Sequence, residues 1–211
     1  PDGTSLVTTF SLPAGRVKLH AMVASPSSHW QLRSRTLELG PLPCLMGIIN
    51  VTPDSFSDGG QFLDPRQAVE QGLQLAEAGA GILDVGGGST RPGSHPVEQS
   101  EEMDRALPVV EELCRQLEIP VSIDTSKAEV ARQALQLGAE IINDVTGLEG
   151  DVEMLDVARH QGAGICAMHM QGNPLTMQVD PRYHDVVADV SRYLADRRDV
   201  LLAAGIERSR I

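Results

Sequence analysis

The sequence predicts an α/β protein built on a parallel β-sheet, because short apolar runs alternate with amphipathic stretches from residue 44 onward. The apolar runs cover residues 44–49, 82–85, 121–123, 140–142 and 165–168. Runs that are apolar almost throughout are typical of parallel strands buried on both faces. The regular alternation of strand and helix therefore predicts five successive βα units with right-handed crossovers.

The stretches between these runs have the features of helices. They cover residues 65–78, 96–117, 126–137, 151–160 and 185–204. The first has apolar residues at helical spacing and ends at a glycine, and the second has acidic residues near its start, where the helix dipole favours them. The residues alone leave two architectures open: a (β/α)8 barrel, of which these would be the first five units, and a doubly wound open sheet.

The beginning of the chain has no strong period. We expect residues 1–30 to be a leader, in which a short hairpin could form, and residues 31–211 to be a barrel-like domain. The chain begins with Pro rather than Met, which suggests that it starts inside a longer gene product or after processing.

Composition excludes several classes of protein. The formal net charge of -12 argues against nucleic-acid binding, which requires a basic surface, and no apolar run approaches the ~18 residues of a membrane span. The three cysteines are far apart, so neither a disulfide framework nor a zinc site is expected. We expect Cys44 and Cys166 to be buried, reduced thiols and the protein to be cytoplasmic.

Polar side chains follow every predicted strand where it ends. They are Asn50, Asp84 with the segment 86–91, Asp124, the pair Asn143 and Asp144, and His169. A single strand-end Asp or Asn usually caps the next helix. Because the carboxyl ends of parallel strands meet at one edge, the whole set instead predicts a ligand site there.

The residue types indicate what that site could bind. Two glycine-rich loops, residues 52–60 and 86–93, offer hydroxyls and backbone N–H groups, and Arg91 suits a phosphate. Asp124 and Asn143 suit a flat, donor-rich heterocycle, since a carboxylate accepts two parallel N–H bonds and an amide both accepts and donates. No motif for a protein nucleophile is present. The residues thus predict an anionic group near the loops and a heterocycle deeper in the site.

Two segments make the sequence resemble dihydropteroate synthase. They are LMGIINVTPDSFSDGG at residues 45–60 and DVGGGSTRPG at residues 84–93, and shorter family segments follow in order at 122–125, 142–144 and 168–172. The resemblance runs from about residue 31 to the last residue. It implies a TIM barrel, commonly a homodimer and a sulfonamide target, that joins 6-hydroxymethyl-7,8-dihydropterin diphosphate to 4-aminobenzoate and releases diphosphate.

The resemblance also implies roles for the residues that match the family's motifs. Asn50 matches the family's asparagine at the Mg²⁺ and diphosphate site. Thr90 matches a residue that contacts the pterin diphosphate, and Arg91 is its neighbour in the loop. Asp124 and Asn143 match the pair that holds the pterin. Asn50 and Arg91 are therefore the expected catalytic residues, acting on the diphosphate leaving group.

Other positions have a weaker or structural expectation. Phe56 and Pro92 match loop positions near the aminobenzoate, where sulfonamides bind, and Met168 matches a wall of the pterin pocket. Asp84 is expected to hold the second loop, and His169 to be a core histidine. The neighbouring Arg197 and Arg198, with Asp185, are expected on a solvated helix surface.

The sequence departs from the family pattern in two respects. Gly88 stands where the family usually has Glu. The later family segments Asp-Pro-Gly-x-Gly-Phe-Gly-Lys, Ser-Arg-Lys and Arg-x-His do not occur in the sequence. We therefore expect a barrel and a site that are incomplete toward the C-terminus, in a chain that is inactive or poorly folded by itself.

Two other functions stay open. A pterin-binding methyltransferase domain shares the barrel and the Asp/Asn pair, but it has no need for diphosphate and hence for the two anion-binding loops. A non-enzymatic binding or partner module would have open sheet edges, which another chain or a second copy would cover.

Overall fold

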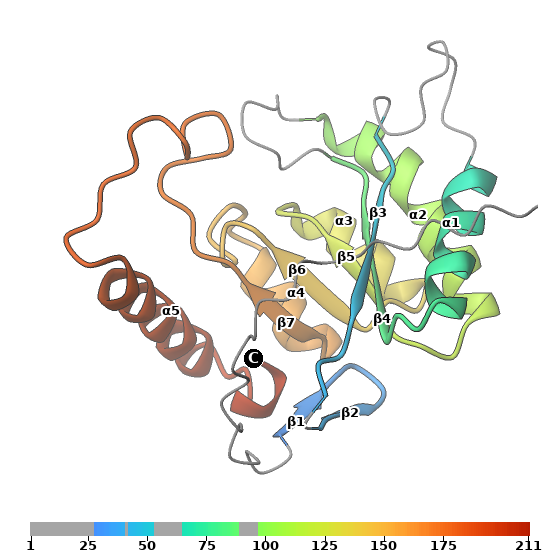
Figure 1. Ribbon diagram of the computed structural model, residues 1–211, viewed down its shortest axis with the longest axis horizontal. Helices are drawn as coiled ribbons and strands as arrows, with labels where there is room; N and C mark the ends of the chain where they lie inside the picture. The colour runs from blue at the N-terminus through green and yellow to red at the C-terminus, as the bar shows by residue number, and fades with distance from the viewer. Residues whose placement is uncertain (1–27, 41, 53–64, 89–96) are drawn as a thin grey trace, which may run out of the picture.

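The central element of the protein is a five-stranded parallel sheet (Figure 1). The computed structural model describes residues 28–40, 42–52, 65–88 and 97–211. The strands of the sheet are β3 (Met46–Asn50), β4 (Ile82–Gly86), β5 (Val121–Asp124), β6 (Ile141–Asp144) and β7 (Gly164–Ala167). The helices are α1 (Pro65–Glu77), α2 (Gln99–Gln116), α3 (Ala128–Gln136), α4 (Met154–Gln161) and α5 (Val186–Ala203). Every strand and helix predicted from residue 44 onward is present.

The order of the strands decides between the two architectures that the sequence left open. The hydrogen-bonded order is β3-β4-β5-β6-β7, so neighbours in sequence are neighbours in the sheet. A doubly wound sheet reverses its order at a switch point, whereas a barrel adds each strand on the same side of the last. Helices α1 to α4 follow the same order, each in contact with the next (Figure 1). The protein is therefore a partial (β/α) barrel.

One row of side chains joins the sheet to its helices. Residues paired across the strands project to the same face of a sheet. One such row is Ile49, Val85, Ile123, Ile142 and Ile165. All five side chains are at most 2% exposed, and they belong to one core cluster with apolar residues of the helices. Burial of each contributes roughly 1.5–3 kcal/mol, which makes this row a main source of the sheet's stability.

A hairpin covers the end of the sheet where the strands begin. It consists of β1 (Ser28–Gln31) and β2 (Thr36–Leu39), paired antiparallel. Trp30 and Leu32 of the hairpin pack with Ile82 and Ile141, which lie at the N-terminal ends of their strands. The Trp30 indole donates to the backbone oxygen of Arg210, 3.1 Å away, next to the end of the chain. The hairpin thus closes the floor of the partial barrel.

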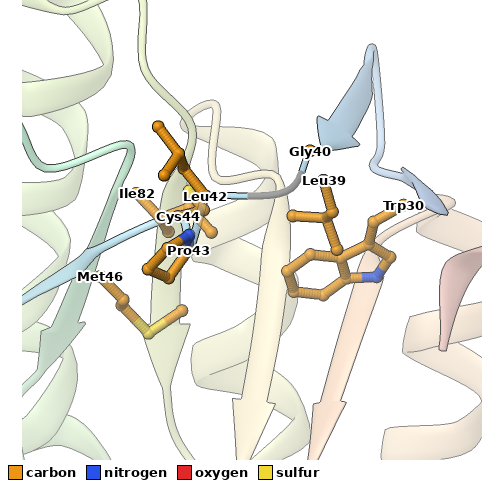
Figure 2. A pocket seen from close by; sticks show the side chains of 8 residues that line it. All are labelled: Trp30, Leu39, Gly40, Leu42, Pro43, Cys44, Met46 and Ile82. Atoms are coloured by element: carbon orange, nitrogen blue, oxygen red, sulfur yellow. The ribbon is translucent and has the colours of Figure 1, made fainter. Parts of the chain in front are cut away.

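An apolar cavity of about 510 Å³ lies between the hairpin and the start of β3 (Figure 2). Its lining includes Trp30, Leu39, Met46 and Ile82, but no charged or amide side chain. Cys44 also lines this cavity and is exposed, so the expectation that it is buried was wrong. The reason is that the segment leading into β3 runs over the surface, where Leu42 is 81% exposed. No helix in the described part of the chain is long and apolar enough to cross a membrane.

Candidate functional site

The polar strand ends form a second row, on the face of the sheet opposite the helices. Register pairs Asn50 with Gly86, Gly86 with Asp124, Asp124 with Asn143, and Asn143 with Cys166. Each residue of this row directly follows, in its strand, a residue of the buried row that begins with Ile49. Its side chain therefore projects to the other face of the sheet. The structure therefore brings Asn50, Asp124 and Asn143 together at the C-terminal edge of the sheet.

The glycine in this row makes room for its neighbour. A Cβ atom at Gly86 would lie 3.4 Å from Oδ2 of Asp124. The Asp124 carboxylate therefore lies over the backbone of β4, on the side toward Asn50 of β3. A larger side chain at position 86 would compete with the carboxylate for this space.

Asp84 lies one step deeper on the same face, two residues before Gly86. Its Oδ2 accepts a hydrogen bond of 2.9 Å from Nδ2 of Asn143, across the intervening strand β5. The Asp84 side chain is only 4% exposed. Burial raises the pKa of its carboxyl, and the neighbouring Ser122 hydroxyl and the hydrogen-bonded Asn143 amide oppose that rise. We expected Asp84 to hold the second loop, of which residues 89–93 lie outside the described residues; the contact seen here is with Asn143.

The two carboxylates give this face a negative potential. Burial raises the pKa of the Cys166 thiol, and the negative charges of Asp84 and Asp124 raise it further. Cys166 is half-buried, so the expectation of a buried thiol is met only in part. Ionised carboxylates only accept hydrogen bonds, so this face suits a ligand that presents N–H donors.

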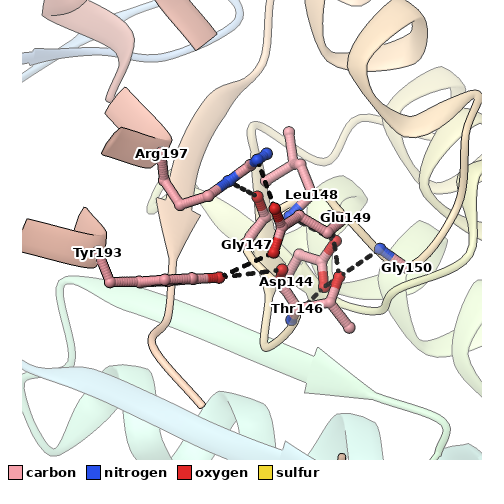
Figure 3. Close-up of polar contacts among 8 residues, drawn as sticks. All are labelled: Asp144, Thr146, Gly147, Leu148, Glu149, Gly150, Tyr193 and Arg197. Atoms are coloured by element: carbon pink, nitrogen blue, oxygen red, sulfur yellow. Dashed lines mark hydrogen bonds and ion pairs between the residues drawn. The ribbon is translucent and has the colours of Figure 1, made fainter. Parts of the chain in front are cut away.

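The loop after β6 is fixed by the residue next to Asn143 (Figure 3). The Asp144 carboxylate accepts from the backbone N–H and hydroxyl of Thr146, both at 2.8 Å, and from the backbone N–H of Leu148 at 3.1 Å. Burial raises the pKa of Asp144, and these hydrogen bonds oppose the rise. Gly147 and Leu148 have positive φ angles of 64° and 65°, a conformation that costs a non-glycine residue about 1 kcal/mol or more. Asp144 therefore holds a turn that the local sequence does not favour.

Helix α5 is bound to the same turn (Figure 3). Arg197 donates from Nε to the backbone oxygen of Gly147 at 2.9 Å and from Nη1 to Glu149 at 2.7 Å. The Tyr193 hydroxyl donates to the other carboxylate oxygen of Glu149 at 3.2 Å. Arg197 is 8% exposed, so the expectation of a solvated surface was wrong for this residue. Its neighbour Arg198 instead pairs with the exposed Asp199.

A third cluster joins the start of α2 to the end of β5. The buried Glu102 accepts from the hydroxyl of Thr125 and from Nζ of Lys127. A Cβ atom at Gly87 would lie 2.7 Å from the backbone oxygen of Glu102, so no side chain fits there without movement. A Cβ atom at Gly88 would lie 3.6 Å from Oε2 of Glu102, an ordinary contact. A glutamate at position 88 would therefore begin its side chain beside an existing carboxylate.

The remaining predicted positions are divided between described and undescribed residues. Met168 follows β7 at the same edge of the sheet and is 38% exposed. His169 is half-buried, with its ring against those of Tyr183 and Tyr193 at centroid distances of 5.9 and 4.9 Å. Phe56, Thr90, Arg91 and Pro92 lie outside the described residues.

Sequence reasoning missed the contact between Asp84 and Asn143, although a signal for it was present. In a strand, residues two apart project to the same face. Asp84 stands two residues before Gly86, and Ser122 two residues before Asp124. A carboxylate inside an apolar strand, in phase with the strand-end residue, predicts a polar contact on the ligand face.

A partial parallel barrel with carboxylate and amide side chains on its C-terminal edge is the arrangement of a ligand-binding barrel enzyme. The sequence pattern of the family described as "Pterin binding enzyme" matches residues 46–211. The chain belongs to this family.

The similar proteins include dihydropteroate synthases. The synthase of Escherichia coli K12 is 47% identical over 169 residues, which are 80% of this chain and 60% of that protein. The structure of the Xanthomonas albilineans synthase with 4-aminobenzoic acid has a TM-score of 0.79 and 44% identity, covering 88% of this chain and 65% of that one. The Yersinia pestis synthase in a sulfonamide drug complex has a TM-score of 0.78 and 43% identity, covering 85% and 64%. The chain spans 56% to 60% of the length of the first curated relatives it matches.

Proposed function

We propose that this chain forms the pterin- and diphosphate-binding part of a dihydropteroate synthase. The enzyme would join 6-hydroxymethyl-7,8-dihydropterin diphosphate to 4-aminobenzoate, giving 7,8-dihydropteroate and diphosphate. The observation that carries the proposal is the row of Asn50, Asp124 and Asn143 at the C-terminal edge of the sheet. The 47% identity to a bacterial synthase supports the reaction, as does the similar synthase that binds 4-aminobenzoic acid.

In this proposal the inner side chains hold the pterin. The carboxylate of Asp124 accepts two N–H bonds from the guanidine-like edge of the ring, and the Asn143 amide accepts a further one. Met168 forms an apolar wall beside the ring. Thr90 and Arg91 bind the diphosphate, while Phe56 and Pro92 lie near the aminobenzoate, where a sulfonamide would also bind.

Asn50 is the proposed Mg²⁺ ligand. It offers one amide oxygen, and within the described residues no group of three or more acidic, histidine or cysteine side chains converges on a point. Mg²⁺ keeps several waters and is often held by few protein ligands together with substrate phosphates. Asn50 therefore fits a cation that is carried largely by diphosphate oxygens. When bound, the cation would neutralise charge on the leaving diphosphate.

The chemistry then requires little from the protein except positioning and charge. The pterin methylene loses its C–O bond to diphosphate, which departs with the electron pair, and the aminobenzoate nitrogen forms the new C–N bond and loses a proton. Asp124 and Asn143 hold the ring so that the methylene faces the incoming amine. Arg91 stabilises the charge that develops on the diphosphate. No protein nucleophile takes part.

Binding is the first test, because the chain spans only part of its relatives. Titration calorimetry with the pterin diphosphate and Mg²⁺ should show binding that Asp124→Asn weakens by about 10- to 100-fold, since a misplaced amide donor would face a ligand donor. Asp199→Asn, at an exposed carboxylate of α5, is the matched control and should leave binding unchanged. Diphosphate release with 4-aminobenzoate measures turnover. Equal binding of a methylated pterin without diphosphate would favour the methyltransferase alternative.

We further propose that the inner face is completed by additional strands, from a longer chain or a second copy. Ile48 projects from the inner face of β3 and is 58% exposed, whereas side chains inside an eight-stranded barrel fill its interior. The 211-residue chain alone would then bind but not turn over substrate. The intact mass of the natural protein tests this, as does its specific activity: normal turnover by a 211-residue monomer would contradict it.

A cytoplasmic location and a homodimer belong to the same proposal. The three cysteines, Cys44, Cys114 and Cys166, are free thiols, which supports a reducing compartment. Family resemblance supports the homodimer, which light scattering of the purified protein would test.

A further inference from the structure

The buried carboxylate of Asp84 has no role in the proposed reaction, yet it touches a residue that does. Its Oδ2 lies 2.9 Å from Nδ2 of Asn143. The two residues come from β4 and β6, with β5 between them, so the contact does not follow from chain proximity. Asp84 is 4% exposed, whereas Asn143 is half-buried and lies in the polar row at the edge of the sheet.

The chemistry of the pair determines how the Asn143 amide is oriented. An amide has one acceptor end and one donor end, and an ionised carboxylate only accepts. The NH₂ group of Asn143 must therefore face Asp84, which leaves its carbonyl oxygen Oδ1 for a ligand. Because Asp124 is its neighbour in the row and also accepts, the two side chains together present acceptors.

We propose that Asp84 is a positioning residue that fixes the Asn143 amide with Oδ1 toward the ligand, so that the row selects a heterocycle with adjacent N–H donors. This inference rests on the proposed function for the identity of that heterocycle, a pterin. It does not depend on that function for the orientation of the amide.

The surroundings of Asp84 are consistent with this role. Ser122 is its partner in the register, and its hydroxyl lowers the pKa of the carboxyl. Asn143 does the same, against the larger effect of burial. Both neighbours therefore stabilise the ionised form, which is the acceptor-only form that the orientation of Asn143 requires.

The decisive variant is Asp84→Asn, which keeps the shape of the side chain. An amide at position 84 can donate to Oδ1 of Asn143, so the Asn143 amide would be free to turn its NH₂ group toward the ligand. Donors would then face donors, and the dissociation constant of the pterin diphosphate should rise by about 10- to 100-fold. Asp199→Asn, at an exposed carboxylate of α5, is the control and should change it by less than about threefold.

A double variant distinguishes positioning from general damage. Asp84→Asn combined with Asn143→Asp exchanges the two groups, so that the new amide at 84 donates to the new carboxylate at 143. An acceptor oxygen again faces the ligand, and binding should recover to within about tenfold of the wild type. Loss of binding through misfolding would not be recovered by this exchange. Asp84→Asn with unchanged binding, or a double variant no better than the single one, would overturn the proposal.

A measurement without ligand separates this inference from the proposed function. In ¹⁵N spectra of the asparagine side chains, the Asn143 NH₂ signal should shift and exchange faster with solvent in Asp84→Asn, and stay in place in Asp199→Asn. If that signal responds but the wild type binds no pterin, the orientation stands and the proposed function fails. If pterin binds but neither the signal nor the affinity responds to Asp84→Asn, the proposed function stands and the positioning role is refuted.

Discussion

Replacing Arg197 by Met should destabilise the protein by about 2 kcal/mol, because Arg197 binds helix α5 to the turn after β6. The substitution keeps most of the apolar stem and removes the guanidinium. The backbone oxygen of the buried Gly147 would lose its donor at 2.9 Å, at a cost of about 1–3 kcal/mol. The ion pair with Glu149 contributes only about 0–1 kcal/mol, since that carboxylate is half exposed.

Arg198 provides the control for this prediction, because it is the next residue of the same helix. Its guanidinium pairs with the exposed Asp199, so Arg198→Met should change stability by less than about 0.5 kcal/mol. Urea denaturation followed by circular dichroism gives both values from the midpoints and a common slope. Equal effects of the two substitutions would refute the reasoning that burial of the Gly147 contact, rather than charge, gives Arg197 its importance.

Three further outcomes follow from individual contacts. Gly87→Ala should destabilise the protein by about 1–3 kcal/mol, because the new Cβ would lie 2.7 Å from the backbone oxygen of Glu102 in α2. Gly88→Ala should be neutral in thermal unfolding, because its Cβ would lie 3.6 Å from the Glu102 carboxylate. Equal losses of stability in the two variants would contradict this. Burial and the nearby Glu140 carboxylate raise the pKa of Cys114 to about 11. At pH 8, Cys114 should therefore be alkylated at least about tenfold more slowly than the exposed Cys44, as mass spectrometry would measure. Folding raises the pKa of Asp84 above 3.8, so the wild type should lose stability relative to Asp84→Asn as the pH rises above that value. A difference in unfolding free energy between the two proteins that does not change with pH would contradict this.

The parts of the fold that the sequence predicts are those decided by local pattern. The five apolar runs and the helices between them follow from periodicity, and the polar residues Asn50, Asp124 and Asn143 follow from their place at strand ends. The sequence pattern did not decide between a barrel and an open sheet, because the order of the strands depends on contacts between residues that are distant in sequence. Arg197 was missed for the same reason: its partner is a backbone oxygen 50 residues away.

The site and the core are coupled through the register of the strands. The buried row with Ile49 and the polar row with Asn50 differ by one residue in every strand, so a slip of one residue would exchange the faces of both rows. The helices therefore hold the polar row in place by burying the other. Because the hydrogen bond from Asn143 to Asp84 spans β5, it can form only when β4, β5 and β6 are all in register. Orientation of the ligand-facing amide thus depends on the same alignment that builds the core.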